Sequence, residues 1–100
     1  MSEDTLQRTI TQMIKVLYPE FVINHSLSGI PLLGSAKQKA QVIAKMKTLG
    51  MVKGLPDLSL YITEGQVLNL ELKTDKGTQS EDQLAIQSKL SNLGHNYFVI

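Results

Sequence analysis

The sequence has no cysteine and no tryptophan, and only five of its 100 residues are aromatic. The absence of cysteine excludes disulfide bonds and thiolate metal sites, so any metal ion must be bound by oxygen atoms or by histidine. The few aromatic rings argue against a surface that binds single-stranded nucleic acid by base stacking. No run of about 18 apolar residues is present and no signal-peptide pattern opens the chain, so we expect a soluble cytoplasmic protein that does not span a membrane.

Acidic residues are missing from the middle of the chain. Residues 21–56 contain no acid and five lysines, a net charge of +5, and these lysines are Lys37, Lys39, Lys45, Lys47 and Lys53. Residues 57–100 contain six acids and three lysines, a net charge of −3. A basic segment beside an acidic one suits a polyanion that lysines hold near a carboxylate-bound metal ion. The simpler alternative is that the lysines only solvate one face of a helix.

The length and the apolar content of 42% fit a single domain with one core, spanning residues 1–100. Capping signals and apolar spacing predict three helices. Asp4 caps the first helix, Ser35 opens the second and Ser80 caps the third. Strands are predicted at residues 21–25, 57–62, 67–73 and 97–100. The order helix, strand, helix, strand, strand, helix, strand predicts an α/β (α+β) fold, a small mixed sheet flanked by helices. Its last step predicts a parallel crossover.

The loop expected between the first strand and the second helix is unusually apolar. It runs from Ser26 to Gly34 and contains Leu27, Ile30, Leu32 and Leu33. Exposed apolar side chains often mark a contact with another protein. We therefore regard this loop as a candidate contact with a second subunit.

The stretch from Gly54 to Lys73 contains the most informative pattern. It consists of a Pro-Asp pair, a strand, a short turn, and a second strand that ends Glu71-Leu72-Lys73. Leucines alternate along both strands, and directly opposed residues of an antiparallel pair share a face. The leucines therefore stay together only if Leu58 pairs with Leu70 and Leu60 pairs with Leu68. This register places Asp57 opposite Glu71.

The same register restricts the connection between the two strands. A two-residue turn at Glu64-Gly65 would place Glu71 opposite Leu58, and burial of a carboxylate among leucines costs several kcal/mol. We therefore expect an odd-length loop or a bulge around residues 63–66. Gly65 is expected to take the positive φ angle.

Two carboxylates and a lysine at adjacent strand ends suit metal-assisted phosphodiester hydrolysis. Mg²⁺ and Mn²⁺ prefer oxygen ligands, so Asp57 and Glu71 are candidates to share one ion, with the carbonyl of Leu72 as a third ligand. Lys73 is a candidate to orient or deprotonate the attacking water, or to stabilise the transition state. The simpler alternative is that Asp57 only starts a strand and that Glu71 and Lys73 form an exposed charge pair.

The combined motifs resemble a known nuclease family. Gly54-Leu55-Pro56-Asp57, Leu70-Glu71-Leu72-Lys73, and Gly77-Thr78-Gln79-Ser80 with Gln83 are similar to the VRR-Nuc (virus-type replication–repair nuclease) family. That family belongs to the PD-(D/E)xK nucleases of restriction-endonuclease-like fold. The match covers nearly the whole chain and is strongest in residues 50–94.

The resemblance implies a role for each motif residue. It implies that Asp57 and Glu71 are metal ligands, that Lys73 is the catalytic lysine and that Gln83 assists in the active site. Family members also use an acid on the first helix as a metal ligand, and Glu3 is the best candidate for it here.

The resemblance also implies a substrate and an assembly. Small stand-alone members from phages and bacteria resemble Holliday-junction resolvases that act as homodimers. We therefore expect a Mg²⁺- or Mn²⁺-dependent endonuclease of branched DNA, acting as a homodimer in the cytoplasm, that of a bacterial host if a phage encodes it. The five central lysines are candidate phosphate contacts, joined by Asn24 and His25, although His25 is more simply a hydrogen-bonding residue at a strand end.

Two other functions fit the same residues. One is a non-catalytic DNA-binding or assembly subunit that retains the nuclease fold, against which the intact Asp57, Glu71 and Lys73 argue. The other is an enzyme of the same fold that acts on RNA.

Overall fold

The computed structural model describes residues 2–26, 32–74 and 77–100. In chain order its elements are α1 (Glu3–Leu17), β1 (Val22–His25), α2 (Ala36–Thr48), β2 (Leu58–Tyr61), the short 3₁₀ turn η2 (Thr63–Gly65), β3 (Val67–Glu71), α3 (Glu81–Asn92) and β4 (Asn96–Val99). The four strands form one sheet in the order β1-β2-β3-β4, antiparallel except for the parallel pair β3 and β4. The predicted mixed α/β class and the parallel crossover are confirmed.

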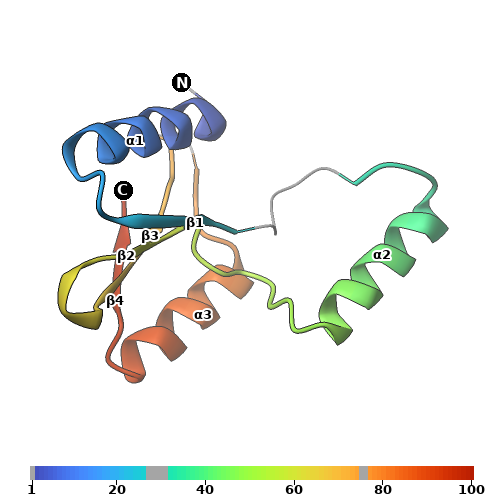
Figure 1. Cartoon of the computed structure of the whole chain (residues 1–100). Helices are drawn as coiled ribbons and strands as arrows, with labels where there is room; N and C mark the ends of the chain where they lie inside the picture. The colour runs from blue at the N-terminus through green and yellow to red at the C-terminus, as the bar shows by residue number, and fades with distance from the viewer. Residues whose placement is uncertain (1, 27–31, 75–76) are drawn as a thin grey trace.

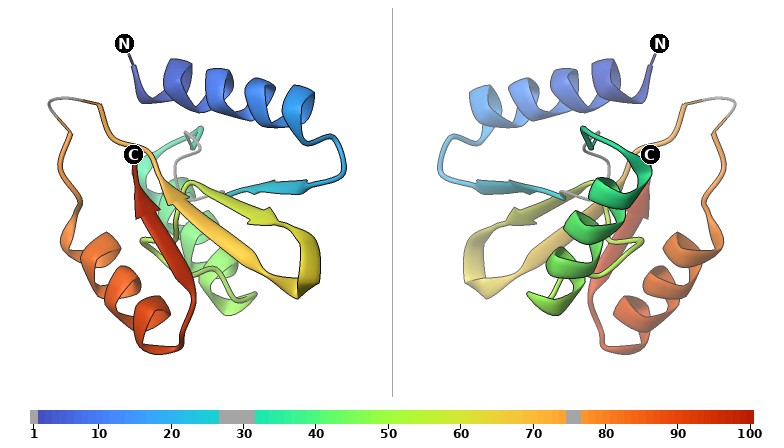
Figure 2. Two further views of the ribbon diagram at one scale, coloured as in Figure 1. Left: turned by 90° about the vertical axis from the view of Figure 1, so that its left-hand side faces the viewer. Right: turned by 90° about the vertical axis from the view of Figure 1, so that its right-hand side faces the viewer.

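The sheet lies between α1 and α3 (Figure 1). One of its faces carries the buried core, which consists of Leu58, Leu60, Leu70 and Leu72. Apolar side chains of α1 pack against these leucines, namely Leu6, Ile10 and Ile14. The two views in Figure 2 show α3 running alongside β4. The face of the sheet opposite the leucines carries polar side chains, among them Ser59, Asn69 and the buried Glu71. Among the described residues, no helix has the length and apolar character needed to cross a membrane.

The first helix begins earlier than predicted. Ser2, and not Asp4, is its N-cap, because the Ser2 side chain accepts a hydrogen bond from the backbone N–H of Thr5 at 3.1 Å. Asp4 therefore lies inside the first turn, where a negative charge interacts favourably with the helix dipole. The start at Glu3 matters for the site, since it places that carboxylate at the end of α1.

The strand register agrees with the leucine pattern. Leu58 pairs with Leu70 and Leu60 pairs with Leu68, as predicted. The connection is odd in length, because the three residues of η2 lie between Ile62 and Gln66, whose backbones are joined by a 3.0 Å hydrogen bond. Gly65 has the expected positive φ, 71°, and Glu64 also has a positive φ, 62°, which was not predicted.

The second helix stands away from the sheet (Figure 1). Ser35 is its N-cap, as predicted, and forms a complete capping box with Gln38 at its start. None of its residues is buried. Of the helices in the described part of the chain, α1 and α3 flank the sheet. The apolar loop before α2 is described only in part, since Leu27 and Ile30 lie outside the described residues, while Leu33 is 90% exposed.

Candidate metal centre

The carboxylates of Asp57 and Glu71 belong to neighbouring strand ends. Glu71 is the last residue of β3 and is fully buried. Asp57 directly precedes β2, and its Oδ2 accepts a 2.8 Å hydrogen bond from the backbone N–H of Leu72. This bond ties the Asp57 carboxylate to the strand that carries Glu71. The structure thus brings the two predicted metal ligands together.

Both carboxylate oxygens of Glu71 accept hydrogen bonds from neutral side chains. Gln83 Nε2 donates to Oε1 at 2.8 Å, and the Tyr97 hydroxyl donates to Oε2 at 3.1 Å. Gln83 is also part of the capping box of α3, since its Oε1 accepts from the backbone N–H of Ser80 at 2.8 Å. One side chain therefore caps α3 and holds Glu71.

Tyr97 was not among the predicted site residues. A weak signal was present, because it is a polar-tipped residue in a short apolar strand. Its position opposite Asn69, on the face that carries Glu71, follows from the parallel register of β3 and β4. Strand alternation alone does not give the register of two strands separated by a helix.

The surroundings of Glu71 favour its protonated form. Burial, and then the neighbouring Asp57 carboxyl group, raise the pKa of Glu71 from 4.5 to about 7, while the Tyr97 hydroxyl and Lys73 act in the opposite direction. Burial and the Glu71 carboxylate also raise the pKa of the Tyr97 hydroxyl. Two carboxyl groups that interact this closely favour a shared proton or a shared cation.

Lys73 lies between two acids. Its Nζ is 3.9 Å from Glu71 Oε1 and 3.8 Å from Glu3 Oε1, and its side chain is mostly buried. The loop after β3 passes close by, because a Cβ added to Gly77 would lie 3.0 Å from Glu3 Oε1. The structure therefore places Glu3 at the edge of the site, in contact with the lysine.

Gly54 explains the position of the Pro-Asp pair. It is buried with a φ of 89°, and a Cβ added to it would lie 2.6 Å from the backbone carbonyl of Asp82. The absence of a side chain thus lets the entry to β2 run directly against the first turn of α3. This contact brings Gln83, which follows Asp82, to Glu71.

The donor set fits a hard divalent cation. Asp57, Glu71 and the carbonyl of Leu72 are the groups suited to hold Mg²⁺ or Mn²⁺, because Mg²⁺ is usually bound by one or two carboxylates with waters and substrate phosphates completing its coordination. Within residues 2–26, 32–74 and 77–100, no cluster of three or more histidine, cysteine or acidic side chains is placed to hold a metal ion. Glu3 is paired with Lys73 and does not form such a cluster with Asp57 and Glu71.

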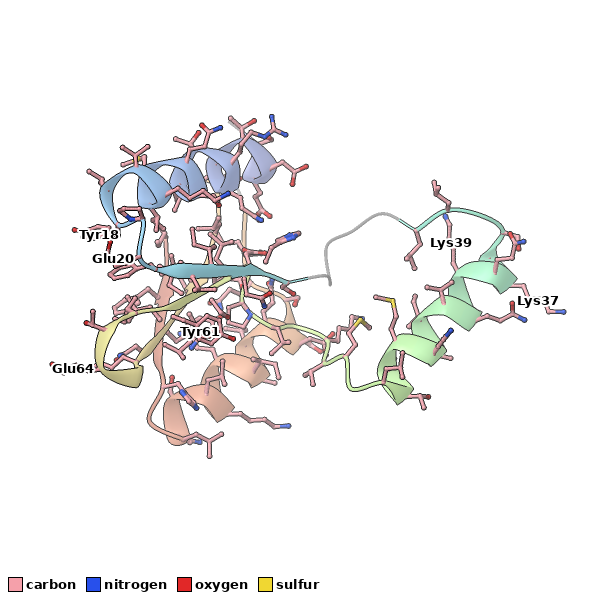
Figure 3. All side chains as sticks on the ribbon, viewed as in Figure 1. Tyr18, Glu20, Lys37, Lys39, Tyr61 and Glu64 are labelled. Carbon is pink, nitrogen blue, oxygen red and sulfur yellow. The ribbon has the colours of Figure 1, made fainter. Side chains whose placement is uncertain are left out.

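The predicted phosphate contacts lie outside this centre. Lys37 and Lys39 lie on the part of α2 farthest from the sheet (Figure 3), and the other two lysines of α2, Lys45 and Lys47, are exposed as well. Among the described residues these four lysines form no ion pair, whereas the exposed Lys53 pairs with Asp82 at 3.3 Å.

The two strand-end candidates on β1 lie on different faces of the sheet. Asn24 pairs with Ser59, and His25 pairs with Leu58. Because directly opposed residues share a face, Asn24 lies on the face of Glu71, while His25 lies on the leucine face. The structure therefore does not bring His25 to the carboxylate pair.

Comparison with known proteins does not assign a family. No protein-family model, no curated protein and no solved structure matches this chain. The function is therefore inferred from the arrangement of Asp57, Glu71, Lys73 and the residues that hold them.

Proposed function

We propose that this protein is a Mg²⁺- or Mn²⁺-dependent endonuclease that hydrolyses phosphodiester bonds in branched DNA. The proposal includes a restriction-endonuclease-like fold of the PD-(D/E)xK type, as the VRR-Nuc resemblance implies. The observation that carries it is the contact of Asp57 with the strand of a buried Glu71, with the Lys73 ammonium 3.9 Å away. A purely structural role does not account for a fully buried carboxylate whose neighbours include a second carboxyl group.

Each residue of the centre has a distinct task in this proposal. Asp57 and Glu71 hold the divalent ion, which when bound supplies a Lewis acid that activates water and neutralises phosphate charge. The Lys73 ammonium orients the attacking water or stabilises negative charge on the phosphate. Glu3 holds the ammonium from the other side, at 3.8 Å, and so fixes its position. Gln83 keeps the Glu71 carboxylate in place.

The basic helix supplies the contact with DNA in this proposal. Four of the thirteen residues of α2 are lysines and none is acidic. The helix stands free of the sheet, so its lysines are available to phosphates some distance from the carboxylate pair. Lys53 and Asn24 lie nearer the body of the protein and are further candidates.

A homodimer is the proposed acting unit. One protomer of 100 residues covers little DNA, and a two-fold pair presents two centres to a two-fold-symmetric junction. Apolar side chains at both ends of α2 support this assembly, because Leu33 is 90% and Leu49 is 77% exposed.

A cleavage assay tests the enzyme. The protein is incubated with labelled four-way junction, flap, linear duplex and RNA, with EDTA, Mg²⁺ or Mn²⁺, beside the Glu71→Gln variant and the control Glu64→Gln, whose residue lies in the exposed η2 turn. We expect metal-dependent cleavage of branched DNA that is lost in Glu71→Gln and retained in Glu64→Gln.

Other outcomes of this assay distinguish the competing functions. Binding of DNA without cleavage under any condition would favour the non-catalytic subunit. Cleavage of RNA alone would favour a ribonuclease. Cleavage that survives Glu71→Gln would point to a different site.

A further inference from the structure

Glu71 is held by a hydrogen-bond chain that runs through Tyr97 to two glutamines. The Tyr97 hydroxyl donates to Glu71 Oε2 at 3.1 Å. Gln79 Nε2 donates to the Tyr97 oxygen at 3.3 Å and to Gln87 Oε1 at 3.0 Å. Tyr97 lies in β4, Gln79 in the loop before α3, and Gln87 in α3. Residues of three separate segments therefore form one chain of hydrogen bonds that ends on Glu71 Oε2.

The directions of these bonds determine what Tyr97 can do. An amide nitrogen has two hydrogens, and those of Gln79 go to Gln87 and to the Tyr97 oxygen. Since the Tyr97 oxygen accepts from Gln79, its own hydrogen is directed to Glu71. A hydroxyl that both accepts and donates in a chain is also a stronger donor than an isolated one. Tyr97 is thus held as a donor to Glu71 Oε2.

The other oxygen of Glu71 is engaged as well. Gln83 donates to Oε1, so each carboxylate oxygen has one remaining lone pair for a cation. Ca²⁺ often takes both oxygens of one carboxylate in a loose shell, while Mg²⁺ requires a small octahedral shell. The two donors restrain the Glu71 carboxylate from moving to fit the larger, variable shell of Ca²⁺, while one lone pair on each oxygen stays available to a small octahedral ion.

We propose that Tyr97, oriented by Gln79, is a positioning residue that restrains the Glu71 carboxylate and makes the carboxylate pair select Mg²⁺ or Mn²⁺ over Ca²⁺. The inference rests on the metal centre of the proposed function, and it does not depend on nuclease activity. The test of the inference therefore measures the binding of cations and not the cleavage of DNA.

The test compares Tyr97→Phe with the wild-type chain. The substitution removes only the hydroxyl, and dissociation constants for Mn²⁺ and Ca²⁺ are measured by titration calorimetry, with competition by Mg²⁺. Loss of a partner that orients a metal ligand typically changes metal affinity by about 10- to 100-fold. We expect the ratio of the Ca²⁺ constant to the Mn²⁺ constant to fall by about tenfold or more, and Gln79→Ala to lower it in the same direction by less.

Tyr61→Phe is the matched control. Tyr61 lies in β2 on the same face of the sheet as Glu71, and it is 48% exposed. Its hydroxyl makes no hydrogen bond to Glu71. We expect both dissociation constants to stay at their wild-type values in this variant.

An unchanged ratio in a folded Tyr97→Phe variant, as judged by circular dichroism and melting temperature, would overturn the inference. If Tyr97→Phe does not fold, Gln79→Ala decides in the same way. Wild-type protein that binds Mn²⁺ but cleaves no nucleic acid would refute the nuclease and leave the ratio as the test of Tyr97. Wild-type protein that binds neither cation would refute both.

Discussion

The carboxyl group of Glu71 is ionisable, and the residue is fully buried. Its pKa is about 7 in the folded chain and 4.5 in the absence of the fold, mainly because of burial and then because of Asp57. At a pH between these two pKa values the folded protein keeps a proton on Glu71, whereas the unfolded chain has lost it. The stabilisation is therefore complete below the lower pKa and is lost as the pH rises through the higher one.

This linkage predicts a pH-dependent stability of the metal-free protein. We expect its melting temperature in EDTA to fall as the pH rises from about 5 to about 8. Glu71→Gln, which cannot ionise, is expected to remove most of this slope and to stabilise the metal-free protein at the upper end. Thermal unfolding at several pH values measures both effects, with Glu64→Gln as the exposed control. A slope that is the same in Glu71→Gln would show that another group is responsible.

In the proposed enzyme, the Lys73 ammonium orients the attacking water or stabilises negative charge on the phosphate. Its Nζ lies between Glu71 and Glu3 and its side chain is mostly buried. We expect Lys73→Gln to lower the single-turnover cleavage rate by roughly 100-fold or more, since loss of one group that stabilises developing charge has an effect of that order. DNA affinity should change little, because one of several cations is removed.

The control for this prediction is Lys89→Gln, at the exposed last turn of α3. It removes the same charge far along the helix from Gln83. Equal losses of cleavage in the two variants would assign the effect to net charge and not to the position of Lys73.

At the scale of elements, the contact between Gly54 and α3 holds the centre together. A Cβ at Gly54 would overlap the backbone of Asp82, and the φ of 89° is itself unfavourable for other residues. We expect Gly54→Ala to destabilise the protein by about 1–3 kcal/mol beyond the effect of φ alone, since overpacking against backbone costs that much. Urea denaturation measures the difference.

Gly50→Ala separates the two causes. Gly50 has a φ of 110°, but a Cβ there would meet nothing within 4 Å. This variant therefore reports the cost of positive φ without an overlap. If Gly54→Ala is no more destabilising than Gly50→Ala, the close approach to α3 is not important for stability.

Local sequence signals favour the second helix. It has a complete capping box, strong helix formers such as alanine, lysine and glutamine, and Gly50 two residues after its last one. Isolated helices of fewer than about 12–15 residues are only marginally stable in water. A polyanion that neutralises the lysines would therefore also stabilise the helix.

Substitution of the four α2 lysines by glutamine tests whether α2 contacts DNA. If each lysine meets one phosphate, the slope of log affinity against log salt should become smaller in magnitude by roughly 3 to 4. The melting temperature should change little, because no residue of α2 is buried. Lys15→Gln and Lys89→Gln, on the other helices, are the controls. A slope equal to that of the wild type would exclude α2 from the interface.

At the scale of the whole molecule, the exposed apolar side chains predict self-association. We expect sedimentation equilibrium to give a mass near twice 11.1 kDa, and Leu33→Ser with Leu49→Ser to shift it toward the monomer. Leu93→Ser is the matched control, because Leu93 is 75% exposed at the end of α3. A monomer at all concentrations, or equal effects of all three substitutions, would contradict the proposed assembly.

The sequence by itself determined the hairpin that carries the centre. Leucines that alternate over two adjacent strands allow one register, and that register puts Glu71 on the face away from the core and next to Asp57. Ser35 and the capping box at Ser80 likewise located the starts of two helices. These features depend on contacts between residues close in the chain, which local patterns encode. The start of α1 was missed because Ser2 and Asp4 are both good caps.

Only the tertiary structure decided what surrounds Glu71. Tyr97 reaches it across a parallel crossover, Gln83 reaches it because Gly54 admits the first turn of α3, and Glu3 meets Lys73 from the far end of the chain. The separation of α2 from the sheet is likewise a feature that only the tertiary structure decided. Such contacts join segments that are distant in sequence, and their geometry is set by how whole elements pack. The alternation of residues within a strand carries no information about that packing.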